Sequence, residues 1–585
     1  MSRPAGGRIA AWLDVRSGEE RAVLLSFAGS FLAISFLVLG RALREALYLE
    51  AFDVRTLPYV TAAVALLSLP VVGRYAAWLA RTPPRRVLRR LGFGLGLGLA
   101  AMAPFLLRSG VAIVAFYLWT ALGALLLTSG FWVVVSEHFP VRGAKRLFGL
   151  IGAGGTLGAL VTGTSVRWLA GRFEAGFLAP MLVALLALFL LAVSCLPPDP
   201  GRPGARAPDA ASLTEGLALV RGSPHLRTIA AIVLTATIAS TVLDYQFKEI
   251  VRSALQTKEE LAGFFGAFYG WTGGAALVIQ LLIAARLMAR AGVARALAAL
   301  PLFLLVGSSA LFLLPGLAVA TLARGGDNAL RKSVFRSVLE FLWVPVPSGL
   351  RRRTKPILDT AVDSAAEGIG AVIVFLWVTL GGLPSRYLSA FVAGAALLFL
   401  GRARFMGRAY AATLRRRLLE EGEDIEHLLD EAGRGHRDLM SATFTRLDIT
   451  RVLEARGIVP GRGGAEPGPT VSRSAPAVDP EAPKPDASLP ADVPTLALAL
   501  ARDALAEAAT SALARIGPAA VPDLAALLAD EKADFVIRRR IPRALARIPD
   551  ARADAALLAA LGSRRFEVRY RAAAALVHRR SSGLP

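Results

Sequence analysis

The sequence predicts an all-α membrane protein in which twelve helical spans form two matching halves, followed by a small α-solenoid. Three observations carry this prediction. The 585 residues are 55% hydrophobic, with a mean hydropathy of +0.53. Charged motifs of the first part recur in the second, and a shorter repeat occupies the C-terminal end.

Long apolar runs are spread over the chain up to about residue 405. An apolar helix of about 20 residues crosses a bilayer, and only helices or closed barrels satisfy their backbone in lipid. The runs lack the alternation typical of barrel strands, so we expect helices. The predicted spans are 22–40, 57–80, 88–107, 111–135, 147–170, 176–196, 228–247, 262–288, 293–315, 317–344, 356–380 and 386–405.

The formal net charge of +23 could suggest a nucleic-acid partner. However, the arginines crowd the ends of apolar runs, as in cytoplasmic loops of membrane proteins, so we expect no nucleic acid. Under the twelve-span count, the basic loops 81–90, 286–295 and 351–355 fall on one side. This asymmetry predicts a multi-pass protein of the inner (plasma) membrane with both termini in the cytoplasm.

Few residues support metal, cofactor or catalytic chemistry. The single cysteine, Cys195, excludes an intrachain disulfide and a cysteine-based metal site, and the five histidines do not cluster. No Ser-His-Asp arrangement or specific carboxylate pair can be assembled. The sequence therefore predicts no cofactor and no enzyme.

Composition divides the chain into five parts. Two six-helix transmembrane halves, 1–200 and 201–406, are followed by charged amphipathic helices over 407–456 and a flexible linker rich in Pro, Gly, Ala and Ser over 457–490. The last part, 491–585, holds the shorter repeat.

The C-terminal repeat has a period just above thirty residues. The segment 512–516 (ALARI) returns at 544–548, and 535–540 (FVIRRR) is matched by 566–571 (FEVRYR). Such a period is typical of an α-solenoid built from pairs of short helices. The pattern is similar to HEAT repeats, which indicates a protein partner for this domain.

The two halves share charged motifs at nearly one offset. Arg44-Glu45 ends the first span and Lys248-Glu249 the seventh, 204 residues later, while Glu340 follows Glu137 by 203 residues. A duplicated six-helix unit is the organisation of the major facilitator architecture, in which substrate binds between the halves near the midplane.

Charged side chains within spans are costly and face a cavity or a partner. Those that recur, or that lie beside apolar runs, are our candidates for the interior. The alternative is that those near helix ends reach the headgroups. A further alternative is a gating role, in which Glu137 pairs with Lys145 and Glu340 pairs with Lys355. The charged residues considered are Arg41, Arg44, Glu45, Glu137, Asp244, Lys248, Glu249, Asp327, Arg331, Arg336, Glu340, Lys355 and Asp359.

The glycine-rich segment 152–163 resembles a phosphate-binding loop only superficially. Leu157 stands where that motif needs glycine, and no strand precedes it. The small residues Gly155, Ala159 and Gly163 recur every four positions, which favours close packing of transmembrane helices.

Five segments resemble the ATP/ADP translocases of plastids and intracellular bacteria, a nucleotide-transporter family with a major facilitator-like fold. The resemblance covers roughly residues 20–405 and excludes the linker and the repeats. The segments are SFLVLGRALREAL (35–47), FWVVVSEHFPVRGAKRLFGLIGAGGTLGALVTG (131–163), LDYQFKEI (243–250), ELAGFFGAFYGWTGGAALVIQLL (260–282) and KSVFRSVLEFLWVPVPSGLRRRTKPILDT (332–360).

The resemblance implies a secondary transporter that moves a nucleotide or related organic anion by alternating access. By motif, the implied substrate-binding residues are Arg44, Glu45, Glu137, Asp244, Lys248, Lys355 and Asp359. Arginine and lysine would hold a polyphosphate through charge-assisted hydrogen bonds. Lys145 and Glu340 are the expected gating residues.

The chain departs from the family after Asp359. The run TAVDSAAEGIG adds Asp363 and Glu367 where the family has basic residues. This acidic helix favours one alternative, a proton-coupled transporter of a non-nucleotide solute. The repeats favour another, a transporter-like membrane anchor or sensor whose HEAT-like domain recruits a protein partner.

Overall fold

The structure is a computed structural model. It describes residues 19–420 and 492–582, apart from gaps at 107, 140, 171, 173–177, 198–212, 344–345, 347, 502–504, 532 and 564. The chain forms two compact units, Met1–Arg417 and Leu418–Pro585.

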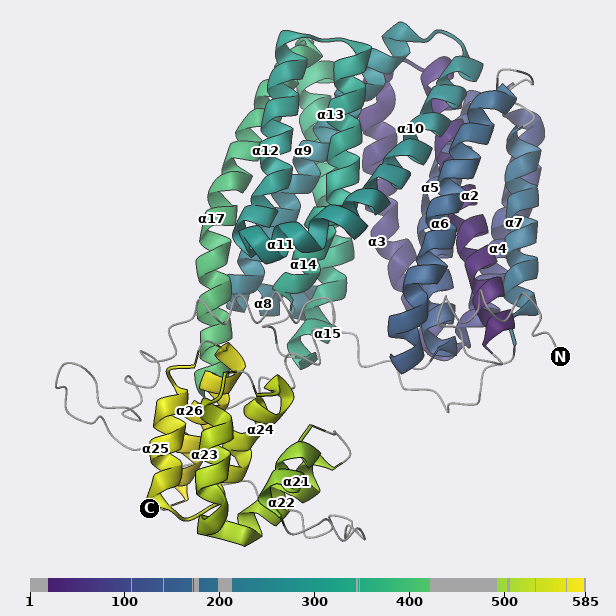
Figure 1. The fold of residues 1–585 in the computed structure, drawn as a ribbon. Helices are drawn as coiled ribbons and strands as arrows, with labels where there is room; N and C mark the ends of the chain where they lie inside the picture. The colour runs from purple at the N-terminus through teal and green to yellow at the C-terminus, as the bar shows by residue number, and fades with distance from the viewer. Residues whose placement is uncertain are drawn as a thin grey trace. The chain divides into compact units, whose positions relative to one another are not determined.

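The first unit is a bundle of helices that run mostly side by side (Figure 1). Four π-helical turns, at Gln280–Ala284, Arg331–Phe335, Ile357–Val362 and Phe375–Leu380, continue α10, α13, α15 and α16. The helices are α2 (Glu20–Ala51), α3 (Leu57–Arg81), α4 (Pro84–Met102), α5 (Gly110–His138), α6 (Val141–Ala170), α7 (Leu178–Cys195), α8 (Leu213–Gly222), α9 (Pro224–Ala254), α10 (Lys258–Ile279), α11 (Ala285–Ala291), α12 (Val293–Leu313), α13 (Leu317–Leu330), α14 (Arg336–Leu342), α15 (Ser348–Pro356), α16 (Asp363–Val374) and α17 (Leu388–Glu420).

Local sequence explains where several of these helices begin. Ser109 and Ser223 accept a hydrogen bond from the third residue of α5 and α9, and Thr257 forms a capping box with Glu260 at the start of α10. Such caps satisfy amide groups that have no partner inside the helix. Pro84 occupies the first turn of α4, where its missing N–H costs nothing.

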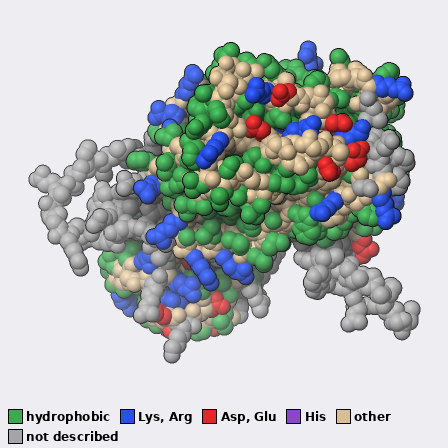
Figure 2. Space-filling model, turned by 90° about the horizontal axis from the view of Figure 1, so that it is seen from above, with side chains coloured by type: hydrophobic (Ala, Val, Ile, Leu, Met, Phe, Trp, Pro, Cys, Tyr) green, Lys and Arg blue, Asp and Glu red, His purple; other side chains and the backbone are tan. Residues whose placement is uncertain are grey.

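The outer surface of this unit is apolar. Leu66, Leu188, Val306 and Leu398 are among many exposed large hydrophobic residues. Seen along the helices, hydrophobic side chains form much of the rim, while charged side chains gather at the helix ends nearest the viewer (Figure 2). A soluble protein rarely exposes so much continuous apolar surface. We conclude that the unit is a multi-pass membrane protein.

Eleven helical stretches in the described residues are long and apolar enough to cross a membrane. Ten belong to the first unit and coincide with ten of the predicted spans. The predicted spans 88–107 and 317–344 are also helical, as α4 and α13–α14, but carry more charge. The twelve-span count therefore stays a prediction. The eleventh stretch, Ala506–Ala529, lies in the second unit and buries Leu513 and Leu524 in that unit's own core.

The glycines of α6 allow very close helix packing, as the small-residue spacing predicted. A Cβ atom on Gly154 would lie 2.5 Å from the carbonyl oxygen of Phe27 on α2. One on Gly163 would lie 2.5 Å from the carbonyl oxygen of Gly266 and 2.8 Å from the Cα of Gly270, both on α10. Thus α6 meets α2 on one face and α10 on another through nearly bare backbone.

Two further contacts join the N-terminal helices to the C-terminal ones near the ends of α2 and α16. The Thr379 hydroxyl donates to the carbonyl oxygen of Arg55 at 3.0 Å. The rings of Tyr59 and Phe375 meet edge to face, 5.2 Å between centroids. Deeper in the bundle, α3 packs along α16, and Ser68 bonds Ser364 at 2.9 Å.

The last helix of the first unit, α17, continues past the predicted span 386–405 and ends at Glu420. It therefore takes in the first residues of the segment 407–456 predicted to form amphipathic helices. The remainder of that segment and the predicted linker 457–490 lie outside the described residues.

The second unit consists of short helices around one apolar core. Within it, the repeated segments starting at Phe535 and Phe566 each open a helix, as their similarity predicts. The helices of its described residues are α21 (Val493–Ala499), α22 (Ala506–Ile516), α23 (Val521–Ala529), α24 (Phe535–Leu545), α25 (Ala551–Ala560) and α26 (Phe566–Ser581).

One arginine ties three of these helices together. Arg579 of α26 is 1% exposed. Its guanidinium bonds Asp554 of α25 at 2.5 Å and the carbonyl oxygens of Leu545, Ile548 and Asp550, which end α24 and precede α25.

We expect Arg579→Met to destabilise the second unit by about 3 kcal/mol, because buried carbonyls lose charged donors. Hydrogen exchange of the full-length protein would show faster exchange in α24–α26 alone. Arg580→Met, at the exposed neighbouring position, is the control and should change stability by less than about 0.5 kcal/mol. Equal exchange in both variants would contradict the role assigned to Arg579.

Candidate functional site

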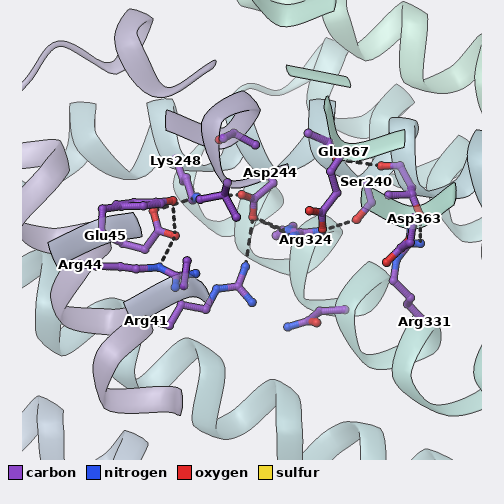
Figure 3. Close-up of a pocket in the computed structure, with 17 residues that line it drawn as sticks. Arg41, Arg44, Glu45, Ser240, Asp244, Lys248, Arg324, Arg331, Asp363 and Glu367 are labelled. Carbon is purple, nitrogen blue, oxygen red and sulfur yellow. Dashed lines mark hydrogen bonds and ion pairs between the residues drawn. The ribbon is translucent and has the colours of Figure 1, made fainter. Parts of the chain in front are cut away.

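A cavity of about 240 Å³ lies inside the first unit, between α2, α3 and α5 on one side and α9, α13 and α16 on the other. Charged and hydroxyl side chains line it, with few apolar ones (Figure 3). Its charged residues are Arg41, Arg44, Glu45, Asp244, Lys248, Arg324, Arg331, Asp363 and Glu367.

Lys248 is the centre of the ion pairs that join the two sides. Its Nζ lies 2.8 Å from Glu45 of α2 and 2.9 Å from Asp244, one turn earlier on α9. Lys248 and Glu45 are 4% and 1% exposed. The Tyr117 hydroxyl of α5 also donates to Glu45, at 3.2 Å. Lys248 and Glu45 both belong to the charged motifs that the two halves share, so a motif residue of the second half neutralises one of the first.

Arg324 extends these pairs to α13. Its guanidinium bonds Asp244 at 2.8 Å, Ser240 at 2.6 Å and Asp327 at 2.5 Å. Asp327 is fully buried and also accepts from Arg331, at 3.3 Å. Since Arg324, Asp327 and Arg331 are spaced by three and four residues, one helix face presents all three.

Arg41 and Arg44 are bound less tightly than the other cations. The nearest carboxylates, Asp244 and Glu45, lie 3.9 Å from them. Their guanidinium groups rest on the rings of Tyr269 and Tyr117, 4.2 and 4.9 Å from the centroids. In the described part of the chain, both Nε atoms are buried without a hydrogen-bond partner. These two groups retain donors for an anion.

The opposite wall is acidic. Asp363 and Glu367 lie one turn apart on α16, on the far side of the cavity from Arg41 and Arg44 (Figure 3). Asp363 accepts from the Thr237 hydroxyl at 2.6 Å. No hydrogen bond or ion pair of Glu367 occurs within the described residues. The cavity therefore separates two loosely held cations from two carboxylates.

The structure brings together four of the seven residues predicted to bind substrate: Arg44, Glu45, Asp244 and Lys248. The other three lie outside this cavity. Glu137 is exposed near the end of α5, and Asp359 is exposed one turn before Asp363. Lys355 bonds Glu340 at 2.5 Å, so this predicted pair is present.

The gating role of that pair stays a prediction. Its counterpart Lys145 lies in α6, but its side chain is outside the described part of the structure.

Arg324 belongs to the site although the sequence did not indicate it. In the tenth predicted span, its charge looked like an interruption of an apolar run. The signal that could have identified it is the spacing of Arg324, Asp327 and Arg331 on one face, because a self-paired charged face in lipid must point inward.

Comparison with known proteins gives a consistent result. The family model described as TLC ATP/ADP transporter matches residues 203–323. The ADP,ATP carrier protein 1 of Chlamydia muridarum is 20% identical over 303 residues, and that of Chlamydia pneumoniae 22% over 307. Each match covers 44% of this chain and 57% or 59% of the relative, so the chain spans less than two thirds of these carriers.

Among solved structures, a D323A mutant of the nucleoside transporter NupG matches with a TM-score of 0.52 at 15% identity. The match covers 66% of this chain and 99% of that one. At this identity the likeness concerns the fold, which is of the major facilitator type expected from the duplication. The sequence matches support the family that the five motifs indicated.

Proposed function

We propose that this protein, which the matches relate to the ATP/ADP translocases, is a secondary transporter that moves a nucleotide or related organic anion by alternating access. The observation that carries the proposal is the pair Arg41 and Arg44, which line a charged cavity between the two sets of helices and whose Nε atoms have no hydrogen-bond partner in the described residues. Phosphate or carboxylate groups form their strongest hydrogen bonds with such guanidinium groups.

The size of the cavity suggests how transport proceeds. Its volume of about 240 Å³ is below the roughly 300 Å³ at which pockets for drug-sized ligands begin. A nucleotide would therefore need the two sets of helices to separate on one side. Ion pairs that cross the cavity, such as Lys248 with Glu45, would have to rearrange during that movement.

The remaining features are part of the same proposal. We infer twelve spans, an inner-membrane location and cytoplasmic termini from the arginine-rich loops. Glu340 and Lys355, paired at 2.5 Å on neighbouring helices, would act as a gate rather than as substrate ligands. The helices of 491–585 would form a HEAT-like array that recruits a protein partner.

The test is nucleotide uptake by proteoliposomes loaded with ATP. We expect saturable uptake of labelled ATP or ADP, competed by the other nucleotide. Arg44→Gln should raise the KM about tenfold or more, since a hydrogen bond to a charged group contributes about 1.5–3 kcal/mol. Arg90→Gln, exposed on α4 outside the cavity, is the matched control and should leave uptake intact.

Two results would contradict the proposal. Uptake that Arg44→Gln does not alter would remove the cavity from the transport path. An absence of nucleotide or organic-anion uptake, combined with capture of a protein by the C-terminal domain, would favour the membrane anchor or sensor.

A further inference from the structure

Glu367 is a carboxylate inside the bundle, and it takes no part in the ion pairs around Lys248. It lines the cavity on α16, and no hydrogen bond or ion pair holds it within the described residues. A charged group in the membrane interior is costly without a partner. Asp363, one turn away on the same helix, is also negatively charged and therefore repels an ionised Glu367.

The surroundings of Glu367 are of mixed sign. The charged groups that act on it are Asp363 of its own helix, Arg41 of α2, Asp244 of α9 and Arg331, which follows α13. Asp244 is held by Lys248 and Arg324, and Arg331 by Asp327. From α3, which packs along α16, the cavity receives only Thr61 and Val64. Arg331 is thus paired with Asp327, and Arg41, which lies 3.9 Å from Asp244, forms no hydrogen bond or ion pair with Glu367 in the described part of the chain.

Counting charges shows what a proton at this carboxylate would change. The charged residues that line the cavity are five basic groups, Arg41, Arg44, Lys248, Arg324 and Arg331, and four carboxylates, Glu45, Asp244, Asp363 and Glu367. Beside them, Asp327 and Lys332 add one charge of each sign. With all of them ionised the site carries a net charge of +1. Protonation of Glu367 would raise this net charge to +2 and so strengthen the attraction for an anion in a cavity of low dielectric.

We propose that Glu367 is the proton-carrying residue of this transporter, protonated when an anion occupies Arg41 and Arg44 and deprotonated when the anion leaves. This inference rests on the proposed function and adds its coupling ion. A proton from water adds to the carboxylate on the side of entry and returns to water on the side of exit, so no other reactant is needed. Because coupling between two sites is reciprocal, the anion favours the proton as much as the proton favours the anion.

The experiment uses full-length protein in liposomes clamped at zero membrane potential, with labelled ATP as the probe. Counterflow of ATP against internal ADP reports the proposed function without a proton gradient. Uptake with the outside more acidic by one pH unit reports coupling. At one proton per ATP, this gradient should raise the internal ATP about tenfold above the external level in the wild type.

Glu367→Gln should reduce the ratio of gradient-driven accumulation to counterflow from about ten to about one. A matched control is Glu50→Gln, an exposed glutamate at the end of α2 outside the cavity, which should keep the wild-type ratio. A second readout needs no transport. Calorimetry of ATP binding in buffers of different ionisation enthalpy should show about one proton taken up by the wild type and none by Glu367→Gln.

The outcomes separate the two proposals. Absent counterflow of ATP and of other nucleotides and organic anions in the wild type would overturn the proposed function, and this inference with it. Counterflow without gradient-driven accumulation would overturn the inference alone. Loss of pH-independent transport in Glu367→Gln would also overturn it, because Glu367 would then hold a cationic group of the solute.

Discussion

Lys248→Met is expected to cost the first unit about 3–5 kcal/mol of stability, the largest effect of any substitution at the cavity. Lys248 neutralises Glu45 at 2.8 Å and Asp244 at 2.9 Å. Without it, Glu45, 1% exposed, keeps only the Tyr117 hydroxyl at 3.2 Å and the distant Arg44. A buried charge stripped of its partner is strongly destabilising.

The measurement is thermal unfolding of the purified protein in detergent, where Tm should fall by at least about 5 °C. The double variant Glu45→Gln with Lys248→Met is the control, because it removes both charges and should recover most of the loss. Equal instability of the single and double variants would show that Lys248 stabilises by packing and not by neutralising Glu45.

Gly163→Ala is expected to reduce both folding yield and transport by tenfold or more. The added Cβ would lie 2.5 Å from the carbonyl oxygen of Gly266 and 2.8 Å from the Cα of Gly270. Both neighbours are backbone atoms, so no flexible side chain can move aside. The whole of α6 would have to shift away from α10.

Gly152→Ala provides a control on the same helix. A Cβ there would meet nothing within 4 Å, and alanine favours a helix over glycine by about 1 kcal/mol. The two variants should therefore change stability in opposite directions. If both behave alike in thermal unfolding and in ATP counterflow, the close approach of α6 and α10 does not matter for folding or transport.

Much of the helical architecture could be predicted because it depends on local composition. Apolar runs of sufficient length must be helical in lipid, and small residues every four positions must face a neighbouring helix. The pairing of Glu45 with Lys248 was not predicted, although both residues were recognised as charged positions at the ends of the first and seventh spans.

How deeply a charged residue lies in the bundle was harder to predict than the sign of its charge. Glu137, Asp244 and Asp359 all appeared as carboxylates beside apolar runs, yet only Asp244 lines the cavity. Whether such a residue meets a cation or solvent depends on contacts between helices far apart in sequence. The bond from Arg324 to Asp244, over 80 residues, is one such contact.

The acidic wall was visible in the sequence as a departure from the family. Asp363 and Glu367 could be recognised as unusual, but their position opposite Arg41 required the packing of α16 against α3 and α9. The volume of the cavity could not be predicted at all, because it results from the side-chain packing of six helices.

The backbone contact between α6 and α10 has a mechanical consequence. Where two helices interlock through large side chains, those side chains must change rotamer before the helices can rotate against each other. At Gly163, Gly266 and Gly270 there are no such side chains, so a small rotation would proceed without disengaging any. This contact would therefore act as a pivot between α6 and α10.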